Sequence, residues 1–448
     1  MGFRNSVFNN SFIKNVLTLF SGTVIAQLIG LAFLPLLTRL FTPEEFGVFY
    51  IFLTTASILS IIATGGYEKS LVLPASENDA GQLLIFSILL SVAVTAISFL
   101  ILLFLGKWGD QFFQTGHSRL ILWLIPVYSL FFGVFRILQN TAIRKKNFRK
   151  VSGSNIIRVA SASVMQAGAG FGHTGGIGLV LGSCIGQIFP LLTFLRKNKK
   201  LTEITIREKV KTAIAKGIEY KDFPLYKMPS DLLNEVSIQL PVYILKIIFS
   251  TAIAGIYSLP QKILSQPSKL IGQAAGEVYY RTASELNSQN KDLSEMTFNT
   301  FKVLFLLGVV PFTIISLWGK EIFSFIFSNE WAFSGRIAAF LSPWLLFVFA
   351  GSPVSYIFLI RQKLKISLLL NLVLLVARFA ALLTGALVFK NLEITIILFA
   401  GISLIYWIFI SFYSLYLGGI RLQKSLFFIS SVLILSVVPL GLIKLFLL

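Results

Sequence analysis

Long apolar stretches recur along the chain, and short polar segments separate them. A helix needs about 20 mostly apolar residues to cross the hydrocarbon core of a bilayer. Thirteen stretches come near or exceed that length, at residues 16–37, 46–66, 81–105, 119–140, 154–171, 177–195, 229–250, 253–277, 299–318, 336–360, 366–389, 393–417 and 425–446. The fifth ends in a run of glycines, and the seventh and eighth are more polar than the rest. The pattern predicts an all-α polytopic membrane protein.

One long basic connection, residues 196–227, separates the first six spans from the next six. Many secondary transporters consist of two such halves around a site near the bilayer midplane. We therefore expect two six-helix lobes, an N-terminal lobe at 1–200 and a C-terminal lobe at 229–424. A basic cytoplasmic linker at 201–228 joins them, and 425–448 form an extra C-terminal transmembrane helix.

The linker has a periodic pattern of its own. Val210, Ile214 and Ile218 recur at helical spacing among basic residues. They predict either an amphipathic helix lying on anionic lipid or a plain basic connector.

Composition and charge agree with a membrane protein. Of the 448 residues, 55% are hydrophobic and 13% are charged, and the net charge is +20. In a soluble protein this charge would indicate nucleic acid, but here it follows the positive-inside rule, so no nucleic-acid partner is expected. Basic clusters at 144–150, 196–227 and 361–365 predict cytoplasmic loops and a cytoplasmic N-terminus. An odd number of spans would place the C-terminus outside.

Few residues are available for metal or cofactor chemistry. The chain has one cysteine, Cys184, and two histidines, His117 and His173, in expected outer loops. It contains no Gly-x-x-x-x-Gly-Lys-Ser/Thr motif for a nucleotide. We expect neither metal nor cofactor, and a transporter rather than an enzyme.

The eighth span carries a polar stripe. It consists of Lys262, Gln266, Lys269 and Gln273, which share one helical face. A charge at the centre of a membrane helix costs roughly 2.5–3.5 kcal/mol on insertion scales, so the stripe should face a wet interior. Pro260 and Pro267 interrupt the same span, and broken helices often form transporter sites.

The seventh span has a similar stripe. It consists of Asp231, Glu235, Gln239 and Lys246, and Pro241 interrupts it. We expect these residues to line the substrate pathway and the three prolines to form part of a gate. Alternatively, Glu235 and Lys246 are structural partners.

Four further polar residues lie within apolar spans, and we expect them to line the substrate pathway as well. They are Gln27, Arg136, Arg158 and Arg378. Arg378, like Lys262 and Lys269, is difficult to place against lipid. Arg136 and Arg158 have an alternative role, in which they extend to the headgroups, and Gln27 has one as interhelical glue.

Two polar pairs lie at the ends of the second span. Glu68 and Lys69 form either an adjacent ion pair or a gate. Thr42 and Glu45 fit a Thr-x-x-Glu capping box, which starts a helix.

Two sets of motifs carry a family resemblance. The first is Leu37-Thr-Arg-Leu-Phe-Thr-Pro-Glu-Glu-Phe-Gly47, followed by Tyr67-Glu-Lys-Ser-Leu-Val-Leu-Pro74. The second is Tyr220-Lys-Asp-Phe-Pro224, followed by Ile271-Gly-Gln-Ala274. The chain resembles the Wzx-type flippases of lipopolysaccharide and O-antigen biosynthesis, in the multidrug/oligosaccharidyl-lipid/polysaccharide exporter superfamily.

The resemblance implies two six-helix lobes around a central cavity in the bacterial inner membrane. It implies a substrate, an undecaprenyl-diphosphate-linked oligosaccharide, that crosses from the cytoplasmic to the outer leaflet by alternating access. Membrane lipids, a polysaccharide polymerase and chain-length machinery are the implied partners. A basic interior agrees with an anionic diphosphate.

Two other functions stay open. The first is a cation-coupled drug exporter of the same superfamily, which would rely on intramembrane acids. The second is a membrane glycosyltransferase or polymerase acting on the same lipid, which would need acidic or histidine residues in a large outer loop.

Overall fold

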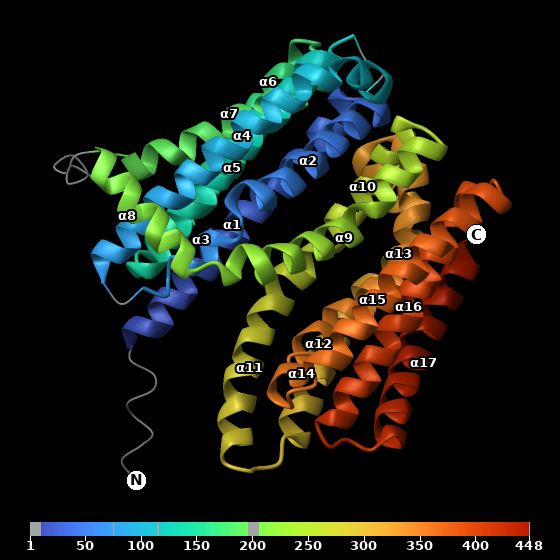
Figure 1. The fold of residues 1–448 in the computed structure, drawn as a ribbon. Helices are drawn as coiled ribbons and strands as arrows, with labels where there is room; N and C mark the ends of the chain where they lie inside the picture. The colour runs from blue at the N-terminus through green and yellow to red at the C-terminus, as the bar shows by residue number, and fades with distance from the viewer. Residues whose placement is uncertain (1–9, 75, 114–115, 196–205, 448) are drawn as a thin grey trace. The chain divides into compact units, whose positions relative to one another are not determined.

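The computed structural model describes residues 10–74, 76–113, 116–195 and 206–447, and within these ranges it contains helices and no strands (Figure 1). The chain divides into two compact units, Met1–Tyr243 and Ile244–Leu448. The division falls inside α9 (Met228–Ile248), whereas the sequence suggested a boundary before that helix. The domain limits given above stay predictions.

The first unit contains six long helices and several short ones. They are α1 (Asn10–Leu40), α2 (Pro43–Thr64), α3 (Tyr67–Ser70), α4 (Glu77–Phe113), α5 (Ser118–Arg144), α6 (Phe148–Phe171), α7 (Gly176–Leu195), α8 (Ile206–Glu219), the π-helical turn η1 (Phe223–Lys227) and the first part of α9. Within this unit α6 packs on both α1 and α7, and α4 packs on α5. Small residues allow the close approach of α6 and α7, since a Cβ on Gly186 would lie 2.6 Å from the side chain of Ala162.

The second unit contains five long helices from α12 onward, preceded by a broken pair. Its elements are α10 (Thr251–Leu264), η2 (Ser268–Gly272), α11 (Gln273–Ser288), α12 (Ser294–Phe327), η3 (Asn329–Trp331), α13 (Ala332–Val354), α14 (Ile357–Ile360), α15 (Leu364–Leu383), η4 (Thr384–Val388), α16 (Leu392–Leu417) and α17 (Leu422–Leu447). Helices α12 and α13 meet backbone to backbone. A Cβ on Gly335 would lie 2.1 Å from the carbonyl oxygen of Gly319, so only glycine fits there.

Every expected span overlaps a helix, and the all-α prediction is confirmed. Ten helical segments among the described residues are long and apolar enough to cross a membrane. The three expected spans outside that set are those of α6, α9 and α10, and α10 has only 14 residues because the helix breaks after Leu264. The same three segments stood out as weak or polar in the sequence.

The interruption expected at Pro267 is present. Helix α10 ends at Leu264, Pro267 precedes the π-helical turn η2, and α11 then runs to Ser288. The expected end of this span at residue 277 was therefore wrong by about three helical turns. Pro260 and Pro241 lie inside continuous helices, α10 and α9.

The helix start at α2 follows the sequence prediction. The backbone N–H of Thr42 donates to Glu45 Oε2 at 2.7 Å, and the N–H of Glu45 donates to Thr42 Oγ1 at 3.3 Å. Both halves of the capping box are therefore formed.

The part of the linker that the structure describes folds onto the first unit. Lys216 of α8 pairs with Asp79 of α4 at 2.8 Å, and the hydroxyl of Tyr67 donates to the carbonyl of Gly217 at 2.9 Å. Ala213 is fully buried on the packed face, while Ile214 and Ile218 are exposed. The linker helix predicted from its periodicity is confirmed, and its contact with lipid stays a prediction.

Candidate functional site

A polar seam joins α2 to the first half of α9 in the first unit. Ser57 Oγ and Gln239 Nε2 both donate to Glu235 Oε1, at 2.9 and 3.0 Å. Thr54 Oγ1 donates to Gln239 Oε1 at 3.2 Å, so the hydrogen bonds form a chain. The predicted stripe on the seventh span is therefore a real polar face. Thr54 and Ser57 lie one turn apart on α2 and were not among the residues predicted from the sequence.

Ion pairs continue this seam beyond the end of α2. Lys69 Nζ lies 2.6 Å from Asp231 Oδ2, and Lys227 Nζ lies 2.7 Å from Asp231 Oδ1. Glu68 instead pairs with Arg136 of α5, with an Nη2–Oε1 distance of 3.1 Å. Glu68 and Lys69 thus bind different helices, and the adjacent pair considered above was wrong. Asp231 and Glu68 connect α3 with α9 and α5.

The Glu68–Arg136 pair is unequal in its exposure. The Glu68 side chain keeps 3% of its surface exposed and that of Arg136 keeps 27%. The second carboxylate oxygen of Glu68 is buried with no hydrogen-bond partner in the part of the chain that the structure describes. This buried charge therefore depends on Arg136 for compensation.

Two other predicted residues of the first unit lie apart from the seam. Arg158 of α6 is half-buried, with its guanidinium carbon 5.6 Å from the ring centroid of Phe135. Gln27 is half-buried on α1. The structure does not bring either residue into contact with the α2–α9 seam.

The stripe of the second unit follows the break between α10 and α11. Lys262 is half-buried, Gln266 is buried, and Lys269 and Gln273 are exposed. Gln266 Nε2 donates to the carbonyl of Lys262 at 3.1 Å, and Gln273 Nε2 donates to Glu277 Oε1 at 3.4 Å. The π-helical turn changes the number of residues per turn, so the four positions do not share one uniform environment. Lys246, on α9, is half-buried.

Arg378 lies in the interior of the second unit. It is 5% exposed, and its Nε donates to Ser403 Oγ of α16 at 2.9 Å. Its guanidinium carbon lies 4.9 Å from the ring centroid of Trp344. The sequence identified this arginine as an interior residue, and the structure adds its aromatic surroundings.

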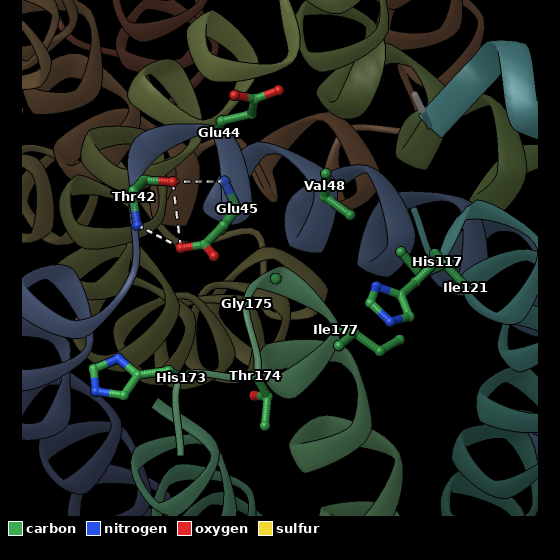
Figure 2. Close-up of a pocket in the computed structure, with 11 residues that line it drawn as sticks. Thr42, Glu44, Glu45, Val48, His117, Ile121, His173, Thr174, Gly175 and Ile177 are labelled. Atoms are coloured by element: carbon green, nitrogen blue, oxygen red, sulfur yellow. Dashed lines mark hydrogen bonds between the residues drawn. The ribbon is translucent and has the colours of Figure 1, made fainter. Parts of the chain in front are cut away.

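A polar pocket of about 400 Å³ lies at the opposite end of the first unit from the ion pairs. Figure 2 shows it between the start of α2, with its capping box, and the loop that carries His173 and Gly175. In this view the ring of His173 lies to the left of Gly175 and the ring of His117 lies to its right. No group of three or more His, Cys, Asp and Glu side chains in the described ranges is arranged to hold a metal ion.

The architecture defines a class of protein, a multi-pass helical membrane protein. Its fold is similar to that of the lipid II flippase MurJ in an inward closed conformation, with a TM-score of 0.68, 13% identity, and coverage of 95% of this chain and 98% of that one. An outward-facing multidrug resistance MATE family transporter of the MOP superfamily gives a TM-score of 0.62 at 13% identity, covering 92% and 96%. A MOP superfamily transporter from Pyrococcus furiosus Vc1 gives 0.60 at 12% identity, covering 92% and 95%. At these identities the likeness establishes the fold.

Sequence comparison then gives the family. Residues 36–335 match the family described as polysaccharide biosynthesis protein. The succinoglycan biosynthesis transport protein ExoT of Rhizobium meliloti (strain 1021) is 21% identical over 322 residues, 70% of this chain and 62% of the relative's length. The chain thus spans less than two thirds of that relative. This chain belongs to the polysaccharide biosynthesis protein family, and the flippase-family resemblance of its motifs is confirmed.

Proposed function

We propose that this protein moves an undecaprenyl-diphosphate-linked oligosaccharide from the cytoplasmic to the outer leaflet of the bacterial inner membrane. The observation that carries the proposal is the family match over 36–335, combined with the fold of MOP transporters. A transporter in polysaccharide biosynthesis needs a cargo that is made on one side of the membrane and used on the other. A lipid-linked glycan is such a cargo, and it would be delivered to a polymerase with its chain-length machinery.

The distribution of charge supports an anionic cargo. Lys246 and Lys262 are half-buried on α9 and α10, and Lys269 is exposed within the π-helical turn η2. A lysine ammonium binds phosphate as a point charge, and its attraction to a diphosphate strengthens as the local dielectric falls. We assign these three lysines to the substrate pathway, and we place the N-terminus in the cytoplasm.

The break at Pro267 supports a moving element. Proline removes a backbone hydrogen bond, and the π-helical turn that follows leaves a short stretch with different geometry. We propose that α10 and α11 change their angle at this turn during transport, carrying Lys262 and Lys269 with the diphosphate. Pro260, Pro241 and Glu68 would then contribute to the same gating.

A cation-coupled exporter of small molecules is the main rival. The seam contains Asp231 and Glu235, the kind of acidic residue that such exporters use. Asp231 contacts two lysines and Glu235 accepts two neutral donors, so the first is charge-compensated and the second is not. The family match favours the lipid-linked cargo.

Reconstitution separates these functions. The purified protein is placed in proteoliposomes with a fluorescent polyprenyl-diphosphate sugar, and an impermeant quencher reports which leaflet the probe occupies. We expect the probe to move into the leaflet that the quencher reaches, so that its fluorescence falls while its chemical structure stays unchanged. Protein-free vesicles give the background rate. A probe that stays in its leaflet while a cationic dye is exported would refute the proposal, as would extension or cleavage of the sugar.

The pathway lysines have a direct test. Lys262→Ala and Lys269→Ala should each slow flipping several-fold, and the double variant more, because each removes one positive charge from the diphosphate's route. Lys424→Ala, which removes a cation stacked 4.6 Å from the ring of Phe298, is the matched control and should flip at the wild-type rate. Wild-type flipping in the double variant, with normal insertion, would remove these lysines from the pathway.

A further inference from the structure

The interior of the second unit holds a buried guanidinium, that of Arg378 on α15. Its Nε donates to Ser403 Oγ at 2.9 Å, and Ser403 Oγ donates to the carbonyl of Phe399 at 2.7 Å. Because the serine's only hydrogen points at that carbonyl, its lone pairs are available to the guanidinium. The serine thereby fixes the arginine's position and leaves the two terminal NH2 groups for another acceptor.

Aromatic rings surround the guanidinium. Its central carbon lies 4.9 Å from the ring centroid of Trp344 and 5.3 Å from that of Phe399. The two rings are perpendicular to each other, with centroids 5.5 Å apart. Cation–π attraction offsets part of the cost of burying the charge. It supplies neither a negative charge nor a hydrogen-bond acceptor in the plane of the guanidinium.

Carboxylates are absent from its neighbourhood. The helices that pack together here, α10, α13, α15 and α16, contain one acidic residue between them, Glu393. Glu393 precedes Ser403 by ten positions, about 15 Å along the helix, and it pairs with Arg336 at 2.7 Å. Within the described ranges, no ion pair involves Arg378. A buried charge without a counter-charge is strongly unfavourable.

Two further donors belong to side chains whose rings pack around that of Phe399. The hydroxyl of Tyr257 and the indole N–H of Trp344 are buried and have no hydrogen-bond partner among the described residues. Their rings lie 6.3 and 5.5 Å from that of Phe399, which the guanidinium also contacts. Indole N–H and guanidinium groups can only donate. The cluster therefore combines a positive charge with two donors that have no partner among the described residues, and no carboxylate there pairs with the guanidinium.

We propose that this cluster binds a small monovalent inorganic anion of the halide class, with chloride as the physiological ligand. The anion would accept from the terminal N–H groups of Arg378 and from the free donors of Tyr257 and Trp344, and it would balance the charge. A water molecule would satisfy the donors and leave the charge uncompensated. Because Arg378 keeps only 5% of its surface exposed, a small anion suits this site better than a diphosphate-linked sugar. The inference is independent of the proposed transport function.

Thermal unfolding of the purified full chain tests the site. Chloride is titrated against gluconate at constant ionic strength, because gluconate is too large to enter. A ligand that binds only the folded state raises Tm with its concentration, so Tm should rise with chloride and with bromide. Tyr257→Phe and Trp344→Phe each remove one donor and keep the ring. Each should weaken chloride binding about tenfold, since hydrogen bonds to charged groups are the strong ones.

Arg378→Gln should abolish the chloride response. If that variant does not fold, the two conservative aromatic variants still decide the matter. Arg336→Gln is the matched control, since it removes a cation of the same unit that already has a carboxylate partner, and its chloride response should equal the wild type's. The proposal is overturned if wild-type Tm is the same in chloride and gluconate. It is equally overturned if the chloride response is unchanged in Tyr257→Phe and Trp344→Phe.

Discussion

Replacing Arg136 with methionine should be much more harmful than replacing its partner Glu68 with glutamine. The methionine keeps most of the arginine's apolar stem but leaves the Glu68 carboxylate, 3% exposed, without a positive charge. Removing one partner of a buried ion pair typically costs about 3–5 kcal/mol. Glu68→Gln leaves Arg136, which is 27% exposed and can reach solvent or headgroups. We expect that change to cost about 1–2 kcal/mol.

The double variant gives the coupling energy. With both charges removed, stability should return to within about 2 kcal/mol of the wild type, because a neutral pair carries no uncompensated charge. The free energy of unfolding is measured for all four proteins under reversible conditions in bicelles, and the cycle isolates the pairwise interaction.

A neighbouring pair supplies the control. Lys69→Met breaks a half-exposed pair with Asp231, which keeps Lys227, so it should cost only about 0–1 kcal/mol. If Arg136→Met lowers the free energy of unfolding no more than Lys69→Met does, burial of Glu68 does not determine the strength of the Glu68–Arg136 pair.

Three further predictions concern the orientation of α6, the contact between α12 and α13, and the packing of α8. Arg149 lies in the first turn of α6, and His173 lies just after the other end of that helix. Once Cys184 is replaced, His173→Cys should react with an impermeant thiol reagent outside intact cells and Arg149→Cys should not; labelling of Arg149→Cys would invert the orientation. Gly335→Ala should lower the free energy of unfolding by at least about 2 kcal/mol, because its Cβ would overlap the backbone of α12. Gly401→Ala in α16 should be tolerated, because its Cβ would meet no atom within 4 Å. The hydrogen bond to Asp79 raises the pKa of Lys216 above its usual 10.5. The Lys216–Asp79 pair therefore stabilises the packing of α8 on α4 fully below about pH 10.5, and this stabilisation is lost as the pH rises through the folded-state pKa. Amide hydrogen exchange in α8 should increase as the pair is lost, and unchanged exchange would show that apolar contacts alone hold the helix.

Much of the fold follows from short-range rules that the sequence expresses directly. Span positions depend on runs of apolar residues, since each residue's transfer into lipid contributes separately. The capping box at Thr42 and Glu45 depends on residues three positions apart, and the break at Pro267 depends on one missing N–H. These features could be predicted because their causes lie within about one helical turn. The family resemblance came from similarly local motifs.

The site residues were predicted only as types and faces. The sequence singled out Glu68, Arg136, Asp231 and Glu235 as polar residues in or beside membrane spans, yet it suggested the wrong partner for Glu68. Pairing of this kind joins residues such as Lys69 and Asp231, far apart in the chain, and no local pattern specifies which helices will meet.

The sequence by itself determined that this chain is a helical membrane protein with basic residues inside its spans, because hydropathy and charge act residue by residue. The tertiary structure decided what surrounds each charge. It placed the Glu68 carboxylate against Arg136, and it buried Arg378 among Trp344, Phe399 and Ser403, where no described carboxylate pairs with it. That difference has one physical reason: the energy of a buried charge depends on neighbours within a few ångströms, and helices from distant parts of the chain supply those neighbours.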